Sequence, residues 1–356
     1  MSNMEKIRIK DVALRAGVSV GTVDRVIHNR PNVSESSLRK VKMALKEMNY
    51  RPNAYASALA YNKIYKFIIL LPKHESEAYW NEIEEGAENA VEARRDFKID
   101  LEKVFYENIN EDSFISAAEE CLSKKPDGIV VVPSELSSTR YLTDKLHENS
   151  IPFVMLDSYM PDLRPLTFYG QDSFASGYFA GRMLMLLATN EKAVALMRRT
   201  KDGKLTSMQQ VNREVGFRHY MRDHFPEVRI VDLEIPFGAS TKETDTILTN
   251  FFNNNRDIHH CITLASKAHI VGEFLLRTNR REIQIMGYDV LEKNAECLRR
   301  GSISFIISQH AFQQGYCSVD ALFQAIVLKK EVAPVNYMPI ELLSKENIDY
   351  YRRNQL

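Results

Sequence analysis

The sequence has few cysteines and no long apolar run. Its 356 residues include four cysteines, which are far apart, and no two of them have Cys-x-x-Cys spacing. A disulfide-stabilised scaffold is therefore disfavoured, and a reducing compartment is expected. Clear apolar runs, such as residues 67–71, are far shorter than the ~20 residues that cross a bilayer. The first residues, MSNMEKIRIKDV, contain no apolar signal core, so we expect a soluble, intracellular protein.

Common catalytic and nucleotide-binding motifs are also missing. The sequence contains no GxxxxGK followed by Ser or Thr, no GxGxxG, no GxSxG and no HExxH. The adjacent His259, His260 and Cys261 could suggest a metal, but neighbours on a strand point to opposite faces and no matched partner pair lies nearby. We therefore expect no enzymatic activity, no cofactor and no metal site.

Charge and pattern divide the chain into a head and a body. Residues 1–63 hold 12 Lys or Arg and 5 Asp or Glu, whereas the remainder holds 35 and 42. A basic head predicts contact with a polyanion. From residue 66 onward, β-rich runs alternate with helical stretches, which favours two linked lobes of parallel α/β layers. The charged run 198–204 is expected to be a solvated loop. The expected strands are residues 66–71, 128–132, 152–157, 193–197, 229–235, 283–287 and 304–308.

The head is predicted to hold three short helices, over residues 9–16, from Ser19 to about residue 28, and after Ser34. Gly17 follows the first helix as a C′ glycine, and Ser19 and Ser34 are good N-caps. The tight, glycine-containing turn between the first two helices is typical of a helix-turn-helix motif. In that motif the second helix enters the major groove of DNA.

The second helix should supply most DNA contacts of the head. Arg25 can pair with guanine O6 and N7, and Gly21 offers no side chain to read a base. Ser19, Thr22 and Asn29 can bind phosphate. The expected DNA-contacting residues of the three helices are Ser19, Val20, Gly21, Thr22, Asp24, Arg25, His28 and Asn29.

One contiguous stretch resembles a known family. Ile9-Lys10-Asp11-Val12-Ala13, Ala16-Gly17-Val18-Ser19, Thr22-Val23, Arg25-Val26, Val33-Ser34 and Asn49-Tyr50-Arg51-Pro52-Asn53 resemble the DNA-binding head of the LacI/GalR family of bacterial repressors. The resemblance implies a helix-turn-helix domain over residues 1–50 and a hinge helix with linker over 51–63 that orders on operator DNA. It also implies that Leu59 wedges into a minor-groove base step and bends the duplex. Asp24 departs from the usual Ser and leaves the operator sequence open.

For residues 64–356 the resemblance implies an effector-binding and dimerisation module similar to the ribose-type periplasmic sugar-binding proteins. Its two α/β lobes are joined by three crossing strands. The N-lobe is expected at about 64–168 and 309–336, and the C-lobe at about 169–308 and 337–356. The expected fold class is thus an N-terminal all-α helix-turn-helix head with a hinge helix, followed by a two-lobed α/β body like a periplasmic binding protein.

The same resemblance implies a set of effector-binding residues in the cleft. Tyr79 and Trp80 stand where the family places aromatics against the ligand, and the guanidinium of Arg213 can hold two ligand oxygens. Ser158 replaces a frequent Arg, and Lys267 replaces an Asp that would accept hydroxyl protons. The implied effector-binding set is Tyr79, Trp80, Ser134, Ser158, Arg213, Ser266, Lys267, Asp289 and Gln309.

Together these features predict a ligand-responsive transcriptional regulator, a cytoplasmic bacterial homodimer that acts at the nucleoid on double-stranded operator DNA without a membrane partner. Asp289 and Gln309 favour a neutral polyol as effector, whereas Arg213 and Lys267 favour an acidic sugar or a sugar phosphate. This choice, and that between induction and corepression, stays open. The alternatives are a sugar-acting enzyme fused to a DNA-binding head, an architectural DNA-binding protein with a silent body, and a transport binding protein.

Overall fold

The structure is a computed structural model that describes residues 7–27, 31–50, 55, 63–74, 79–108, 110–201, 204–205 and 207–353. The chain separates into two compact units, residues 1–63 and 64–356. Three of the expected DNA contacts, His28, Asn29 and Leu59, lie outside the described residues. Within the described residues, no helix is long and apolar enough to span a bilayer.

The head is built from three helices, α1 (Ile9–Ala16), α2 (Val20–Ile27) and α3 (Glu35–Glu47). Gly17 ends α1 in the left-handed region, with φ 63°, as the sequence predicts. The Ser19 hydroxyl accepts a hydrogen bond from the backbone N–H of Thr22 at 3.1 Å, and Ser34 caps α3. Side chains from all three helices form one core, whose fully buried members are Val12, Ala13, Ala16, Val23, Val26, Val41 and Ala44.

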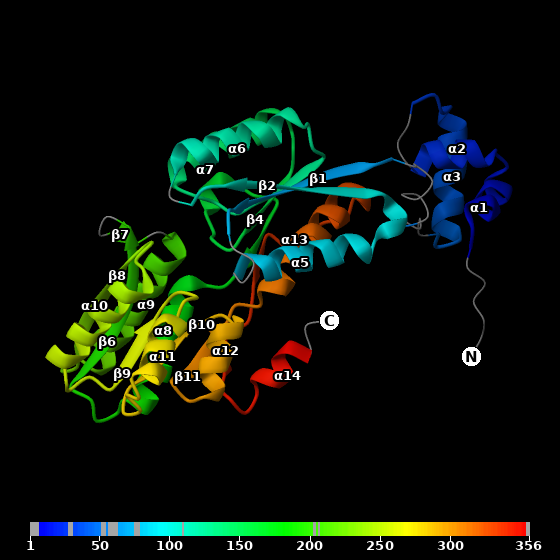
Figure 1. The fold of residues 1–356 in the computed structure, drawn as a ribbon. Helices are drawn as coiled ribbons and strands as arrows, with labels where there is room; N and C mark the ends of the chain where they lie inside the picture. Colours follow the sequence, from blue (N-terminus) through cyan, green and yellow to red (C-terminus); the bar gives the residue numbers. More distant parts are fainter. Residues whose placement is uncertain are drawn as a thin grey trace, which may run out of the picture. The chain divides into compact units, whose positions relative to one another are not determined.

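The N-lobe of the body contains a parallel sheet with the strand order β12-β5-β4-β3-β1-β2 (Figure 1). Helices α6 and α7 pack on one face of this sheet, and α13 packs on the other face together with α5. Both faces are therefore covered, which explains why the central strands are continuously apolar. The bounds are β1 Tyr65–Pro72, α5 Tyr79–Glu92, β2 Ile99–Tyr106, α6 Glu111–Ser123, β3 Gly128–Val131, α7 Leu136–Glu148, β4 Phe153–Leu156, β5 Thr167–Gly170, α13 Ala311–Leu322 and β12 Val335–Tyr337.

The C-lobe repeats this three-layer plan. Its sheet has the order β13-β11-β10-β9-β6-β7, with β8 also paired to β6, and only β13 and β7 run antiparallel to their neighbours among the described strands. Helices α8 and α9 cover one face, and α10, α11 and α12 cover the other. The bounds are α8 Ser173–Leu187, β6 Ala193–Lys201, β7 Lys204–Leu205, α9 Met208–His224, β8 Arg229–Pro236, α10 Thr241–Asn254, β9 His260–Thr263, α11 His269–Arg277, β10 Gln284–Tyr288, α12 Glu292–Arg299, β11 Ile303–Ser308, β13 Glu341–Leu343 and α14 Ile348–Arg353.

The chain crosses between the lobes three times, at residues 171–172, 309–310 and 338–340, as the ends of the flanking elements show. The sequence places the first crossing after residue 168. That position is slightly early, because β5 continues to Gly170 in the N-lobe sheet and was not among the expected strands. Short hydrogen-bonded crossings of this kind allow two lobes to move as rigid bodies about a few backbone positions.

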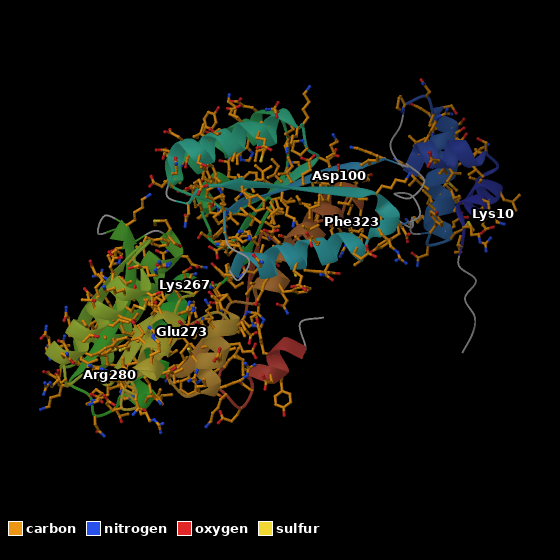
Figure 2. All side chains as sticks on the ribbon, in the orientation of Figure 1. Lys10, Asp100, Lys267, Glu273, Arg280 and Phe323 are labelled. Atoms are coloured by element: carbon orange, nitrogen blue, oxygen red, sulfur yellow. The ribbon has the colours of Figure 1, made fainter. Side chains whose placement is uncertain are left out.

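Glycine lets the helices of each lobe approach at backbone distance. A Cβ built on Gly177 of α8 would lie 1.9 Å from the carbonyl oxygen of Arg213 on α9, and one built on Gly216 would lie 2.1 Å from the carbonyl oxygen of Phe174. The N-lobe pair α5 and α13 uses Gly86 in the same way, with a contact of 2.0 Å. A side chain at Gly177 or Gly216 would push α8 and α9 apart. The close contact between these two helices therefore determines the position of Arg213. The side chains that fill both lobes are drawn in Figure 2.

Candidate functional site

The outward face of α2 carries several of the residues that the sequence predicts to contact DNA. Val23 and Val26 are buried in the head core, whereas Val20 is 45% exposed and Arg25 is exposed. The hydroxyls of Ser19 and Thr22 lie 2.9 Å apart at the start of the helix. The arrangement presents the N-terminal part of α2 to a partner, as a recognition helix requires. Contact between these residues and DNA stays a prediction.

A cavity of about 510 Å³ lies between the two lobes of the body. Its walls include residues that end or follow parallel strands of both sheets, such as Pro72 at the end of β1, Asp157 after β4, Arg199 near the end of β6 and Gln309 after β11. Such carboxyl ends are where α/β sheets commonly bind ligands. Six of the nine residues in the implied effector-binding set line this cavity, namely Tyr79, Trp80, Arg213, Ser266, Lys267 and Gln309.

The other three members of the set, Ser134, Ser158 and Asp289, are not among the residues that line the cavity. Asp289 is 4% exposed and accepts two hydrogen bonds from the Gln309 amide, at 2.8 and 3.0 Å. Ser158 donates to the Asp157 carboxylate at 3.2 Å. The backbone N–H of Ser134 donates to a threonine hydroxyl on α7. Ligand binding by any of the nine residues stays a prediction.

The floor of the cavity is formed by a buried guanidinium between two carboxylates. Arg213 is 1% exposed, and its Nη1 donates to the backbone carbonyl of Leu264 at 3.1 Å. Its Nη2 donates to the Gln309 side-chain oxygen, and its Cζ lies 4.1 Å from the centroid of the Tyr288 ring. Asp157 and Asp289 both lie within the field of this guanidinium. A buried charge needs such compensation, so the charge of Arg213 is balanced within the protein.

A chain of side-chain amides links the floor across the two lobes. Gln209, one helical turn before Arg213 on α9, donates to the Asp157 carboxylate at 3.0 Å and to the Gln309 oxygen at 2.9 Å. Gln309 in turn donates to Asp289. Asp157 belongs to the N-lobe, Gln209 and Asp289 belong to the C-lobe, and Gln309 lies at a crossing. The amide chain therefore connects both lobes through the cavity floor.

Burial dominates the acid–base properties of the floor. It raises the pKa of Asp289 to about 6, although Arg213 opposes the shift. It also raises the pKa of Asp157, against the opposing effect of Arg213 and of nearby hydrogen-bond donors. Above pH 6 or so the carboxyl of Asp289 is largely ionised, and it then places a negative charge near the guanidinium of Arg213. Carboxylates and amide oxygens accept hydrogen bonds, so this floor suits the hydroxyl groups of a ligand.

A buried asparagine holds the C-lobe loops at the cavity. The Asn294 side chain is fully buried, and its Nδ2 donates to the backbone carbonyls of Ser266, Tyr288 and Asp289 at 2.7 to 3.0 Å. Its Oδ1 accepts from the backbone N–H of His269 at 2.8 Å. These contacts join the loop after β9 to the loop after β10. Ser266 and Asp289 are thereby kept in place beside the cavity.

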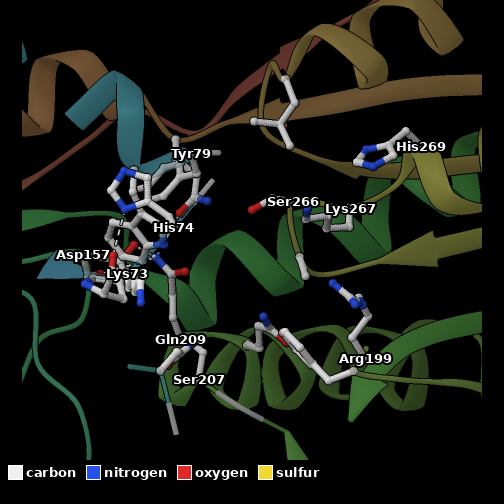
Figure 3. Close-up of a pocket in the computed structure, with 18 of the residues that line it drawn as sticks. Lys73, His74, Tyr79, Asp157, Arg199, Ser207, Gln209, Ser266, Lys267 and His269 are labelled. Atoms are coloured by element: carbon white, nitrogen blue, oxygen red, sulfur yellow. Dashed lines mark hydrogen bonds between the residues drawn. The ribbon is translucent and has the colours of Figure 1, made fainter. Parts of the chain in front are cut away.

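Sequence reasoning missed several cavity residues. Gln209 was detectable, because a residue four positions before Arg213 lies on the same face of a helix. The expectation of a solvated loop over residues 198–204 is wrong for its first part, because β6 runs to Lys201 and Arg199 lines the cavity. Phe237 and His269 also line it, and nothing in their local sequence distinguishes them as cavity residues. Figure 3 shows Arg199 and His269 on the side of the cavity opposite Tyr79 and Asp157.

The fold and the cavity define a class of protein, a DNA-binding regulator with a two-lobed ligand-binding module. Comparison with known families agrees with this class. Residues 8–53 match the bacterial regulatory proteins of the lacI family, and residues 68–331 match the periplasmic binding protein domain. The chain belongs to the lacI family of bacterial regulatory proteins.

Individual relatives span different parts of the chain. A crystal structure assigned to a LacI transcriptional regulator from Bacteroides fragilis is 40% identical, covers 81% of this chain and 100% of its own, and has a TM-score of 0.79. The ribose operon repressor of Lactococcus lactis is 24% identical over 353 residues, which cover 95% of this chain and 98% of the repressor. The transcriptional regulator DegA of Bacillus subtilis is 29% identical over 219 residues, and the match spans 61% of either chain.

Proposed function

We propose that this protein is a transcriptional repressor whose affinity for operator DNA is set by a small, sugar-like ligand in the interlobe cavity. The observation that carries the proposal is the cavity floor, where Asp157 from one lobe and Gln209 from the other meet in a buried polar cluster. A ligand that bonds to this floor contacts both lobes at once. Its binding free energy therefore depends on how the lobes are arranged, which is the requirement for an allosteric ligand. The proposed activity is binding without catalysis.

The DNA-binding form is proposed to be a homodimer located in the bacterial cytoplasm at the nucleoid. Two helix-turn-helix heads would read two half-sites of a near-palindromic operator, because operator symmetry mirrors protein symmetry. The hinge residues 51–63 would order on DNA, with Leu59 as the wedge. The relatives are named as transcriptional regulators and repressors, which supports this role. Coupling between the cavity and the heads is expected to amount to roughly 1–3 kcal/mol, or about 5- to 150-fold in operator affinity.

The experiment uses the full chain. A duplex is first selected from random DNA by the protein, and its affinity is measured by fluorescence anisotropy against a scrambled duplex of equal length. The titration is then repeated with neutral sugars, acidic sugars and sugar phosphates at millimolar concentration. We expect a preference of at least a thousandfold for the selected duplex, and a change in its affinity with at least one ligand.

Two results would contradict the proposal. Equal affinity for the selected and scrambled duplexes, with a steep dependence on salt, would make the protein an architectural DNA-binding protein. The second result is a ligand that binds the protein in calorimetry but leaves its sequence-specific affinity for the operator unchanged. That result would show that the cavity and the head are not coupled.

A further inference from the structure

Basic residues outnumber acidic residues in the lining of the cavity, and only part of this excess belongs to the floor. Its lining contains five Lys or Arg residues and two Asp or Glu residues. Arg213 is already balanced by the floor carboxylates, and Lys73 forms an ion pair with Glu107 at 2.7 Å. Three further cations, Arg199, Lys267 and Lys293, line the C-lobe side of the cavity together with the carboxylate of Glu292.

Arg199 is oriented by an aromatic ring. Its Cζ lies 4.2 Å from the centroid of the Phe237 ring, and both residues line the cavity. Stacking on a ring leaves the N–H groups of a guanidinium directed outward in its own plane, where they can hold two oxygens of a carboxylate or phosphate. Figure 3 shows Arg199 and Lys267 on the same side of the cavity. Two cations on one wall can together hold an anionic group of a ligand.

His269 adds a hydrogen-bond acceptor to the same wall. The Nδ2 of Asn294 faces three carbonyl oxygens, so the orientation of this amide is determined and its Oδ1 must face His269. The Nδ1 of His269 lies 2.9 Å from that Oδ1 and must therefore carry the proton. Burial lowers the pKa of His269, which keeps the ring neutral. Its Nε2 is then a lone-pair acceptor, and His269 lines the cavity.

We propose that the effector is a hydroxylated anion, a sugar acid or sugar phosphate, whose acidic group binds Arg199 and Lys267 while its hydroxyls bind the acidic floor and His269. This inference rests on the proposed function. The cavity presents negative and acceptor groups at its floor and positive groups on its C-lobe wall. A neutral sugar satisfies the floor alone, whereas an acidic sugar matches both surfaces. The carboxylate and the phosphate share this chemistry, and the experiment separates them.

Isothermal titration calorimetry of the full chain tests the proposal with matched ligands. The probes are D-glucose, D-glucuronate and D-glucose 6-phosphate, the same three derivatives of D-galactose, and inorganic phosphate. At least one acid is expected to bind about tenfold or more tightly than its neutral parent, since a charge-assisted hydrogen bond contributes that much. The variants are Lys267→Gln and Arg199→Gln, with Lys242→Gln on the exposed surface of α10 as control. Each cavity variant should weaken the acid about tenfold and its parent less than threefold.

Specific outcomes overturn the inference. The inference fails if no acidic sugar or sugar phosphate binds, or if a neutral sugar binds as tightly as its acidic derivative. It also fails if the cavity variants weaken the binding of the acidic and the neutral sugar equally. Inorganic phosphate that binds as tightly as the sugar phosphate would show an anion site without sugar recognition. Arg199→Lys, which retains the charge, should recover part of the affinity and excludes a folding defect. If neutral sugars alone bind and alter operator affinity, this inference fails while the proposed function stands. If an acidic ligand binds as expected but the protein shows no sequence-specific DNA binding, the proposed function fails while the anion subsite stands.

Discussion

Gln209 of the C-lobe donates its side-chain amide to the carboxylate of Asp157 in the N-lobe, at 3.0 Å, with both side chains buried. This bond spans the cavity floor directly. The same amide also reaches Gln309 at the second crossing between the lobes. The contact therefore links the interlobe cavity to a segment that crosses between the lobes, and it is a direct place to test how the lobes are held together.

Gln209→Ala should loosen the connection between the lobes. The variant removes the donor that Asp157 and Gln309 share, and cavity water can replace it only in part. We expect the free energy of unfolding to fall by about 1 kcal/mol, measured by urea denaturation of the full chain. Gln210→Ala is the matched control, because Gln210 lines the cavity without such a bond. Equal losses for both variants would contradict an interlobe role for Gln209.

Gly177→Ala should disrupt the packing of α8 on α9. The Cβ of the new alanine would lie 1.9 Å from the carbonyl oxygen of Arg213. The backbone of α9 can move away from it only if the two helices separate. We expect a loss of about 2–3 kcal/mol in the free energy of unfolding and weaker ligand binding, since Arg213 would shift. Gly181→Ala, one turn later, meets the side chain of Tyr220 at 2.9 Å, which can rotate. Its cost, measured by the same denaturation, should be clearly smaller.

Asp289→Asn should change how stability depends on pH. Burial raises the pKa of Asp289 from 3.8 to about 6, so the native state binds this proton more tightly than the unfolded chain does. Between pH 4 and 6 the free energy of unfolding must then fall as pH rises, by a total of roughly 3 kcal/mol from this group. Asparagine removes this titration, and it tolerates the φ of 67° at this position. The variant should gain stability relative to the natural protein as pH rises from 4 to 7.

Denaturation at pH steps from 4 to 8 checks this prediction, with Asp100→Asn on the N-lobe strand β2 as an exposed control. The control should leave the pH dependence unchanged. A parallel offset between Asp289→Asn and the natural protein at every pH would show that the carboxyl does not titrate in this range. In the same variant, ligand affinity should fall, because an amide in place of the carboxylate disturbs the hydrogen bonds by which Asp289 holds Gln309 at the cavity.

Arg25→Ala tests the recognition face of α2. Arg25 is exposed there beside Gly21 and Val20. We expect specific binding to weaken by about 1–3 kcal/mol and the preference at one base pair to relax. Anisotropy titrations against the selected duplex and its single-base variants make the measurement. Equal losses on every duplex would identify a phosphate contact instead.

Strong local patterns made much of the fold predictable. The helices of the head follow from the caps Ser19 and Ser34 and from Gly17, which act within one turn. Central strands such as β1 are uniformly apolar because both faces are covered. Strand β2 was missed because it lies at the edge of its sheet and carries charged residues between apolar ones. Strands β12 and β13 are only a few residues long and pair solely through long-range contacts.

The cavity was predictable only where a resemblance supplied positions. Arg213 and Gln309 were expected at the ligand and line the cavity, while Asp289 lies behind Gln309. Gln209, Arg199 and His269 come from three separate elements, and their meeting depends on how those elements pack. No local pattern encodes the distance between them.

The sequence by itself determined the alternation of strands and helices, the basic head with its helix-turn-helix pattern and the two-lobed α/β body. These features depend on capping, periodicity and burial, which act over a few residues. Only the tertiary structure decided that Arg213 is balanced by Asp157 and Asp289, and that cations gather instead on the opposite wall around Arg199 and Lys267. Electrostatic interactions depend on distance and burial in space, and those quantities exist only after the chain has folded.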